Sequence, residues 1–247
     1  MEKALIQCVG ICKTYPKDSK RVLDALTFDI HKGEILGVFG PNGAGKTTLI
    51  SILCSIQQAS DGSVWFYLPE KTSPKAARKF IGFVPQDFAF FPELTALQNL
   101  EYFGKMQGVP STLLKSRIDE LLQKVGLFSV KNKKALTFSG GMKRRLNLII
   151  ALLHQPEILF LDEPTVGIDV QSKMAIISLL QELNKQNVTI VYTSHHLKEA
   201  EDFCSKIILL DHGKIVANDS LDVLLKTHNV SNLEELILYV TGKELRD

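Results

Sequence analysis

Glycines and hydroxyl residues surround one lysine in the stretch GPNGAGKTT at positions 40–48. The stretch follows the apolar run Ile35 to Phe39 and precedes a helical pattern, which predicts a strand, a loop and a helix. Glycines let main-chain N–H groups curl around phosphates, and a helix N-terminus adds partial positive charge. Lys46 would reach the β- and γ-phosphates of a nucleotide, and the Thr47 hydroxyl would bind Mg2+. The stretch predicts a phosphate-binding loop, and a glycine-rich turn without a ligand is the alternative.

Two adjacent carboxylates follow another apolar run. The residues Ile158 to Leu161 predict a buried strand that delivers Asp162 and Glu163 at its end. One carboxylate in this position can hold Mg2+ through water, and the next can orient an attacking water. A solvated turn would explain the pair if it stood alone, but beside a phosphate-binding loop the pair predicts nucleotide hydrolysis.

A second possible anion site lies in FSGGMKRRLNL, from Phe138 to Leu148. Ser139, Gly140 and Gly141 precede a helical pattern, so a hydroxyl and main-chain donors would meet a favourable helix dipole. A chain with one phosphate-binding loop binds one nucleotide, so this site is surplus unless it serves a second chain. The basic run from Lys143 to Arg145 is expected to be a solvated helix face.

Composition limits the classes of partner. The 247 residues carry a net charge of only +2, which gives no reason to expect nucleic acid. The four cysteines show no zinc-ligand spacing and are expected to be thiols in a reducing compartment, with a Cys8–Cys12 redox pair as the alternative. The sequence shows neither a signal-peptide pattern nor an apolar run of membrane-span length. We therefore expect a soluble cytoplasmic protein that reaches a membrane only through a partner.

Short apolar runs with intervening helical patterns predict an α/β fold with an antiparallel β portion near the N-terminus. The turn Asp211-His212-Gly213-Lys214 predicts a hairpin. From Asp87 to about Arg145 only helical patterns occur, including Leu97 to Met106 and Thr112 to Val125. We therefore expect an α/β core at 1–86 and 146–220, an inserted helical lobe at 87–145, and a short helical tail at 221–247.

These motifs together resemble the ATP-binding subunit of an ABC transporter, a P-loop NTPase, over nearly the whole chain. The residues that resemble the family's Walker A motif are Gly40, Pro41, Asn42, Gly43, Ala44, Gly45, Lys46, Thr47 and Thr48. The run Ile158 to Glu163 resembles Walker B, and Phe138 to Met142 resembles the signature loop. The resemblance implies that ATP and Mg2+ are the cofactors. The sequence departs from the family's signature at Phe138, where leucine is usual, and at Met142, where glutamine is usual.

Four further residues are assigned by the same resemblance. Gln86 is similar to the Q-loop glutamine that senses Mg2+ and the membrane partner, so it is expected both as a metal ligand and in catalysis. Asp169 closes a stretch similar to the D-loop, although Val166-Gly167 replaces the usual serine-alanine. His195 resembles the switch histidine, and Tyr15 resembles the aromatic residue on which adenine stacks. His196, the residue after His195, is expected to be a surface residue.

The resemblance implies a motor ATPase on the inner face of the cell membrane. A head-to-tail homodimer, or a heterodimer with a related ATPase chain, would sandwich two MgATP and drive a separate transmembrane permease subunit. The signature form and the tail resemble the bacterial branch that exports antibiotics, lipids and polysaccharides. An ABC-type ATPase with a non-transport role and a non-hydrolysing regulator are the alternatives. The phenylalanines Phe88, Phe90 and Phe91 would either line a groove for the membrane partner or fill the core of the lobe.

Overall fold

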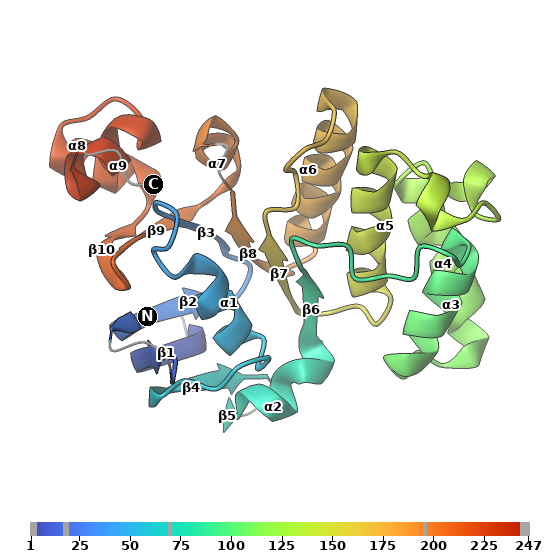
Figure 1. The fold of residues 1–247 in the computed structure, drawn as a ribbon, viewed down its shortest axis with the longest axis horizontal. Coiled ribbons are helices and arrows are strands. Elements are labelled where there is room, and N and C mark those ends of the chain that lie inside the picture. The colour runs from blue at the N-terminus through green and yellow to red at the C-terminus, as the bar shows by residue number, and fades with distance from the viewer. Residues whose placement is uncertain (1–3, 17–19, 69–70, 195–196, 243–247) are drawn as a thin grey trace. The chain divides into compact units, whose positions relative to one another are not determined.

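The computed structural model describes residues 4–16, 20–68, 71–194 and 197–242. The chain forms two compact units (Figure 1). The first unit contains residues 1–78 and 189–247, and the second contains residues 79–188. The sequence-based boundaries at 86/87, 145/146 and 220/221 stay a prediction.

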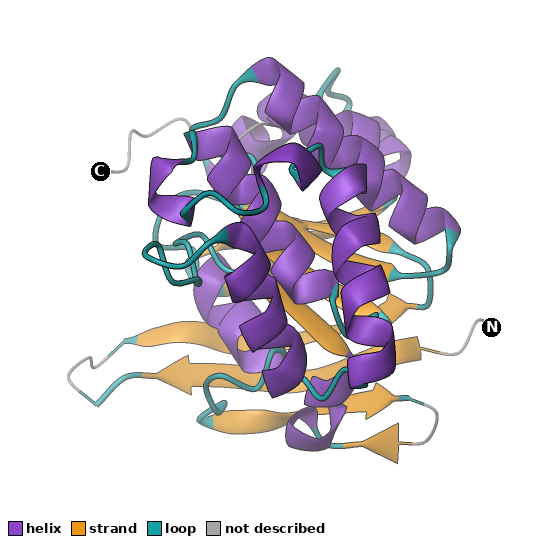
Figure 2. Ribbon diagram, turned by 90° about the vertical axis from the view of Figure 1, so that its right-hand side faces the viewer, coloured by secondary structure: helices purple, strands orange, loops and turns teal. Residues whose placement is uncertain are grey.

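An antiparallel sheet in the first unit has the strand order β2-β1-β4-β5. Its strands are β1 (Ala4–Thr14), β2 (Arg21–His31), β4 (Asp61–Tyr67) and β5 (Lys71–Thr72). Long strands of this sheet run side by side in the lower part of Figure 2. Cys8 pairs with Phe28 of β2 on one side and with Val64 of β4 on the other. All three side chains are buried, and the antiparallel portion predicted from the sequence is confirmed.

Four more strands of the first unit lie in the order β10-β9-β3-β8. Their bounds are β3 (Ile35–Phe39), β8 (Thr189–Thr193), β9 (Lys206–Asp211) and β10 (Lys214–Asp219). Strand β3 is parallel to both β8 and β9, and β10 is antiparallel to β9. Every residue of β3 and β8 is buried, which explains why their sequences are nearly continuous apolar runs.

The helices of the first unit are α1 (Lys46–Leu53), α2 (Pro74–Ala77), α7 (Leu197–Phe203), α8 (Leu221–His228) and α9 (Leu233–Thr241). Both α7 and α8 pack against α9. Along the chain, the first unit continues into the second through a 3₁₀ turn, η1 (Arg78–Phe80). Within the described residues, no helix combines the length and the apolar character needed to cross a bilayer.

The second unit combines one parallel strand pair with four α-helices. Its elements are β6 (Ile81–Val84), α3 (Ala96–Met106), α4 (Ser111–Lys124), α5 (Gly140–Leu152), β7 (Ile158–Asp162), α6 (Val170–Lys185) and the 3₁₀ turns η2 (Phe128–Val130) and η3 (Ala135–Thr137). Helix α5 packs against both α3 and α6 (Figure 1). A reciprocal capping box between Thr95 and Gln98 begins α3. The two helices predicted between residues 97 and 125 are confirmed within one residue at each end.

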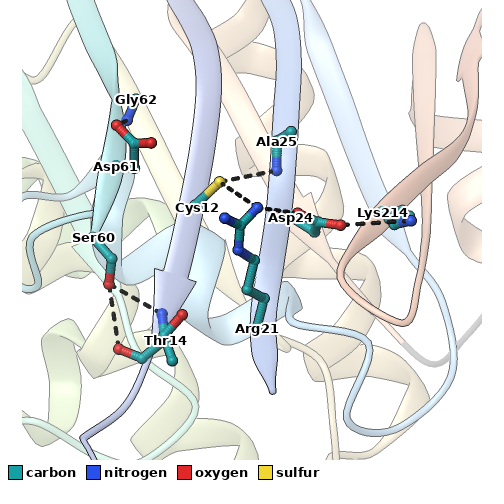
Figure 3. A network of polar contacts seen from close by, with 9 residues as sticks. All are labelled: Cys12, Thr14, Arg21, Asp24, Ala25, Ser60, Asp61, Gly62 and Lys214. Carbon is teal, nitrogen blue, oxygen red and sulfur yellow. Dashed lines mark hydrogen bonds and ion pairs between the residues drawn. The ribbon is translucent and has the colours of Figure 1, made fainter. Parts of the chain in front are cut away.

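The hairpin turn between β9 and β10 is fastened to strand β2. His212 and Gly213 both have positive φ, 45° and 73°, as a two-residue hairpin turn requires. The Asp24 N–H donates to the Gly213 oxygen at 2.8 Å, and the Gly213 N–H donates to Ala44 at 3.2 Å. The Asp24 carboxylate pairs with Lys214 at 3.5 Å (Figure 3). The turn therefore connects β2 to the loop that begins α1.

Gly213→Ala should destabilise the protein more than Gly10→Ala. A Cβ at Gly213 would lie 2.3 Å from the Val22 oxygen, whereas a Cβ at Gly10 meets no atom within 4 Å. Both glycines have positive φ, so Gly10→Ala costs only the conformational term of about 1 kcal/mol, and Gly213→Ala should exceed roughly 2 kcal/mol. Urea unfolding measures both, and equal losses would contradict the close approach.

Candidate functional site

The loop at residues 40–45 joins the buried strand β3 to helix α1. Gly40 has a φ of 146°, and a Cβ there would lie 2.0 Å from the Leu210 oxygen, so only glycine fits. Asn42, Gly43 and Thr47 are exposed. The first turn of α1 contains no acidic residue, so no local carboxylate opposes the positive end of its dipole. The loop is thus held in shape by close packing and remains open to an anion.

Lys46 is tied to the main chain of this loop. Its Nζ atom donates to the Gly40 oxygen at 2.8 Å and to the Pro41 oxygen at 3.1 Å, and the residue is only 8% exposed. A phosphate oxygen is charged and therefore accepts a stronger hydrogen bond than a carbonyl. The lysine is already beside the loop that would hold the phosphates.

Tyr15 lies beside the start of α1. Its hydroxyl donates to Gln57 Oε1 at 2.9 Å and lies 3.5 Å from Thr48 Oγ1. The Lys13 ammonium is 5.3 Å from the ring centroid. The structure therefore brings together the predicted aromatic residue and the end of the predicted phosphate loop. Gln57, which fixes the hydroxyl, carries no sequence signal of its own.

The acidic pair lies in the second unit, at the end of β7. Strand β6 pairs in parallel with β7, so their carboxyl ends share one edge and deliver Gln86 near Asp162 and Glu163. Gln86 Nε2 donates to Glu163 Oε2 at 3.2 Å. Asp162 and Glu163 are 3% and 7% exposed, so they are not the solvated turn that the sequence also allowed.

The main chain at Glu163 is strained. Its φ is 51°, a left-handed conformation that costs on the order of 1–3 kcal/mol for a residue with a side chain. Such strain is concentrated at functional sites, where the surroundings enforce it. The strained position fixes the direction of a buried carboxylate, which is what a general base needs.

The residues predicted to bind Mg2+ are distributed over both units. Thr47, in the first unit, offers a hydroxyl, whereas Asp162 and Gln86, in the second unit, offer a carboxylate and an amide oxygen. Among the described residues, no group of three or more histidine, cysteine, aspartate and glutamate side chains forms a metal cage. Mg2+ typically takes one or two carboxylates, waters and substrate phosphates, so this sparse set fits it.

The predicted second anion site begins helix α5. Ser139 is the N-cap, and its Oγ accepts the Met142 N–H at 3.3 Å. Ser139 and Gly140 are exposed, whereas Gly141 is buried. A Cβ at Gly141 would lie 2.1 Å from Ser172 Oγ and 2.9 Å from Asp169 Oδ2. The signature residues and Asp169 are therefore neighbours.

Asp169 caps helix α6. Its carboxylate accepts the Ser172 N–H at 2.9 Å and the Ser172 hydroxyl at 2.8 Å. Two helix N-termini, those of α5 and α6, thus meet through Gly141. His195 and His196 lie outside the described residues.

One residue of the basic run contradicts the sequence-based expectation. Arg144 is only 6% exposed, so the prediction of a solvated face from Lys143 to Arg145 is wrong at this position. Its guanidinium donates to the Gln86 oxygen, and Asn147, one turn later, also bonds the segment after β6. Sequence reasoning missed both residues. The available signal was the single polar residue, Asn147, within the otherwise apolar run LNLIIAL, because a polar side chain among core residues needs hydrogen-bond partners.

Comparisons with known proteins define the class. The family model described as ABC transporter matches residues 23–166. The ATP-binding protein LnrL for linearmycin resistance from Bacillus subtilis is 43% identical over 86% of this chain and 68% of its own length. The doxorubicin resistance ATP-binding protein DrrA from Mycobacterium tuberculosis is 36% identical over 87% of this chain and 65% of its own length. The chain thus spans about two thirds of these relatives.

Solved structures confirm the fold class. An ATP-binding subunit of an ABC transporter superposes with a TM-score of 0.86 at 24% identity, covering 96% of this chain and 99% of the other. A dimeric ATP-binding cassette in a post-hydrolysis state with ADP and phosphate has a TM-score of 0.79 at 28% identity, covering 87% and 98%. The fold is that of an ATP-binding cassette. The chain belongs to the ABC transporter family, a family of ATPases, as its motifs implied.

The cap at Asp169 should make stability depend on acid pH. The hydrogen bonds from the Ser172 N–H and hydroxyl lower the pKa of Asp169. A folded pKa below the unfolded value, near 3.9, contributes stability above that value, and this contribution is lost as pH falls through the folded pKa. Asp169→Asn keeps an acceptor but does not titrate. The parent should lose its Tm advantage over this variant below about pH 4, and a constant difference across pH would refute the assignment.

Proposed function

We propose that this chain is the ATP-hydrolysing motor subunit of an ABC exporter. The observation that carries the proposal is the buried Glu163 carboxylate, held at 3.2 Å by the Gln86 amide next to Asp162. A nucleotide-binding regulator would not need a strained, directed carboxylate at this position. The export role is supported by relatives whose names give resistance to linearmycin and doxorubicin.

Each site residue then has a chemical role. The main chain of residues 40–48 and Lys46 bind the phosphates, and Tyr15 stacks on the adenine. Thr47, Asp162 and Gln86 would hold Mg2+, which would supply positive charge beside the phosphates. Glu163 orients the attacking water and accepts its proton, and His195 is assigned as the second catalytic side chain by family resemblance.

The signature residues serve a second chain. Ser139, Gly140, Gly141 and Asp169 lie together at two helix N-termini, where an anion is stabilised. In a head-to-tail pair with two-fold symmetry, each phosphate loop faces the partner's signature, so two ATP molecules are held between the chains. The partner is a second copy or a related ATPase chain. Hydrolysis then removes the γ-phosphate that joins them and opens the pair.

A transmembrane permease subunit is the remaining partner, which places this chain on the inner face of the membrane. Of the three phenylalanines after Gln86, Phe90 is 9% exposed and belongs to the core, whereas Phe88 and Phe91 are 43% and 45% exposed. The Phe91 and Tyr102 rings meet edge to face with their centroids 5.1 Å apart, and Tyr102 is 48% exposed. Exposed aromatic groups of this kind favour a protein partner.

Glu163→Gln should bind ATP with parent affinity but lower turnover at least about 100-fold, because an amide cannot accept the water's proton. Glu182→Gln is the matched control, since Glu182 is an exposed carboxylate of the same unit that pairs with Lys124 at 2.7 Å. Phosphate release and fluorescent nucleotide titration measure the two effects. Turnover within a few-fold of the parent would show that Glu163 is not the base.

Mixing two inactive chains tests the sandwich. Lys46→Ala removes the charge that meets the phosphates, and Ser139→Arg blocks the signature, so neither chain alone should occlude ATP. Their heterodimer has one site with both defects and one site with neither, and it should occlude one ATP. A chain carrying both substitutions is the control and should occlude none. If the two chains associate without restoring occlusion, the signature acts within its own chain.

A further inference from the structure

Two side chains of helix α5 hold the segment that follows strand β6. Asn147 Nδ2 donates to the Pro85 oxygen at 3.2 Å, and Asn147 Oδ1 accepts the Ala89 N–H at 3.1 Å. Arg144 donates through Nη1 to the Gln86 oxygen. Three main-chain groups within residues 85–89 are thus bonded by one helix, although this segment has no helix or strand of its own.

The positions of these side chains explain the arrangement. Arg144 and Asn147 are three residues apart and therefore share one face of α5. They are 6% and 3% exposed, so water competes little for their hydrogen bonds. An asparagine supplies both a donor and an acceptor, which lets it bond both ends of the segment. We name Arg144 and Asn147 together the α5 clamp.

Arg144 commits a buried charge to this clamp. Its Nε atom is buried and has no hydrogen-bond partner among the described residues. Its guanidinium lies 5.0 Å from the Phe88 ring, and the carboxylates of Asp87 and Glu163 act on it electrostatically. A purely structural anchor of this segment would not require a charge, because an uncharged donor also satisfies a carbonyl.

The same segment also contacts Glu163 of the acidic pair. The clamp bonds the Gln86 main chain, while the Gln86 side chain donates to Glu163 Oε2 at 3.2 Å. The amide position therefore depends on where α5 holds its backbone. We propose that Arg144 is a positioning residue for hydrolysis, which sets the Gln86 amide on Glu163 and makes this contact move with the signature helix.

The proposal rests on the proposed ATPase function and identifies a further residue of that site. Helix α5 has Ser139 as its N-cap, so the clamp connects the signature cap to Gln86 within the same unit. The exposed Phe88 ring packs on the same guanidinium, so a partner seated on this ring would reach the buried clamp through Phe88. Hydrolysis would then respond to the signature cap and to such a partner through the position of Gln86.

Arg144→Met tests the positioning role because methionine keeps the apolar stem and removes the donor and the charge. We expect kcat to fall about tenfold while the affinity for ATP stays within about twofold, since the phosphate loop is untouched. Arg144→Lys keeps the charge and one donor and should recover part of the loss. Arg117→Met is the matched control: Arg117 also donates to a main-chain oxygen of the second unit, that of Leu153 at 3.1 Å, and its loss should change kcat less than about twofold.

A double-mutant cycle with Gln86→Ala separates positioning from folding. Alanine keeps the main-chain oxygen that Arg144 bonds but removes the amide, so Arg144→Met should lower kcat less than about twofold in that background. An unchanged tenfold loss in the Gln86→Ala background would overturn the proposal, and so would an Arg144→Met chain with parent kcat. If Arg144→Met does not fold, as judged by circular dichroism, Arg144→Lys carries the same cycle. A parent that binds but does not hydrolyse ATP would instead refute the proposed function.

Discussion

The second unit depends on one constraint, which is that Glu163 combines a buried carboxylate with a left-handed backbone conformation. Glu163 can neither relax its φ of 51° nor move into water, because β7 before it is buried along its whole length. Such a group persists only where neighbouring contacts over-determine it. The parallel partner β6 provides the first of these contacts, since it ends beside β7 and delivers Gln86 to the carboxylate. The α5 clamp then holds the segment after β6.

The first unit meets a comparable constraint at its phosphate loop, where the main chain approaches a neighbour too closely for any side chain. Gly40 lies against the Leu210 oxygen, and Ala44 accepts a hydrogen bond from Gly213 in the β9–β10 turn. The loop is therefore shaped by a hairpin about 170 residues later in the chain, while its own exposed residues stay available to a ligand. Stiffness without burial is what an anion cradle needs, because preorganised donors lose little freedom on binding.

Much of this arrangement could be predicted from the sequence because local patterns fix it. The runs that become β3, β6 and the first four residues of β7 are apolar throughout, and the glycine spacing at 40–45 has few other uses. The burial of Arg144 could not be predicted, because it depends on a segment 58 residues away that carries no periodic pattern. A basic residue on a helix is usually exposed, and tertiary packing reverses that expectation here. The anchoring of Tyr15 by Gln57 is hidden for the same reason, since the pair is separated by 42 residues.

The departures from the family signature acquire a physical meaning at the start of α5. Phe138 is 5% exposed, so a phenylalanine in place of leucine remains a core residue and keeps the approach to the cap. The cap bond joins Ser139 Oγ to the main-chain N–H of residue 142, and every residue except proline supplies that donor. Methionine at this position therefore leaves the helix N-terminus intact. The element that cannot vary is Gly141, because any Cβ there would displace the Asp169–Ser172 cap of α6. The geometry thus separates the positions that shape the anion site from those that only border it.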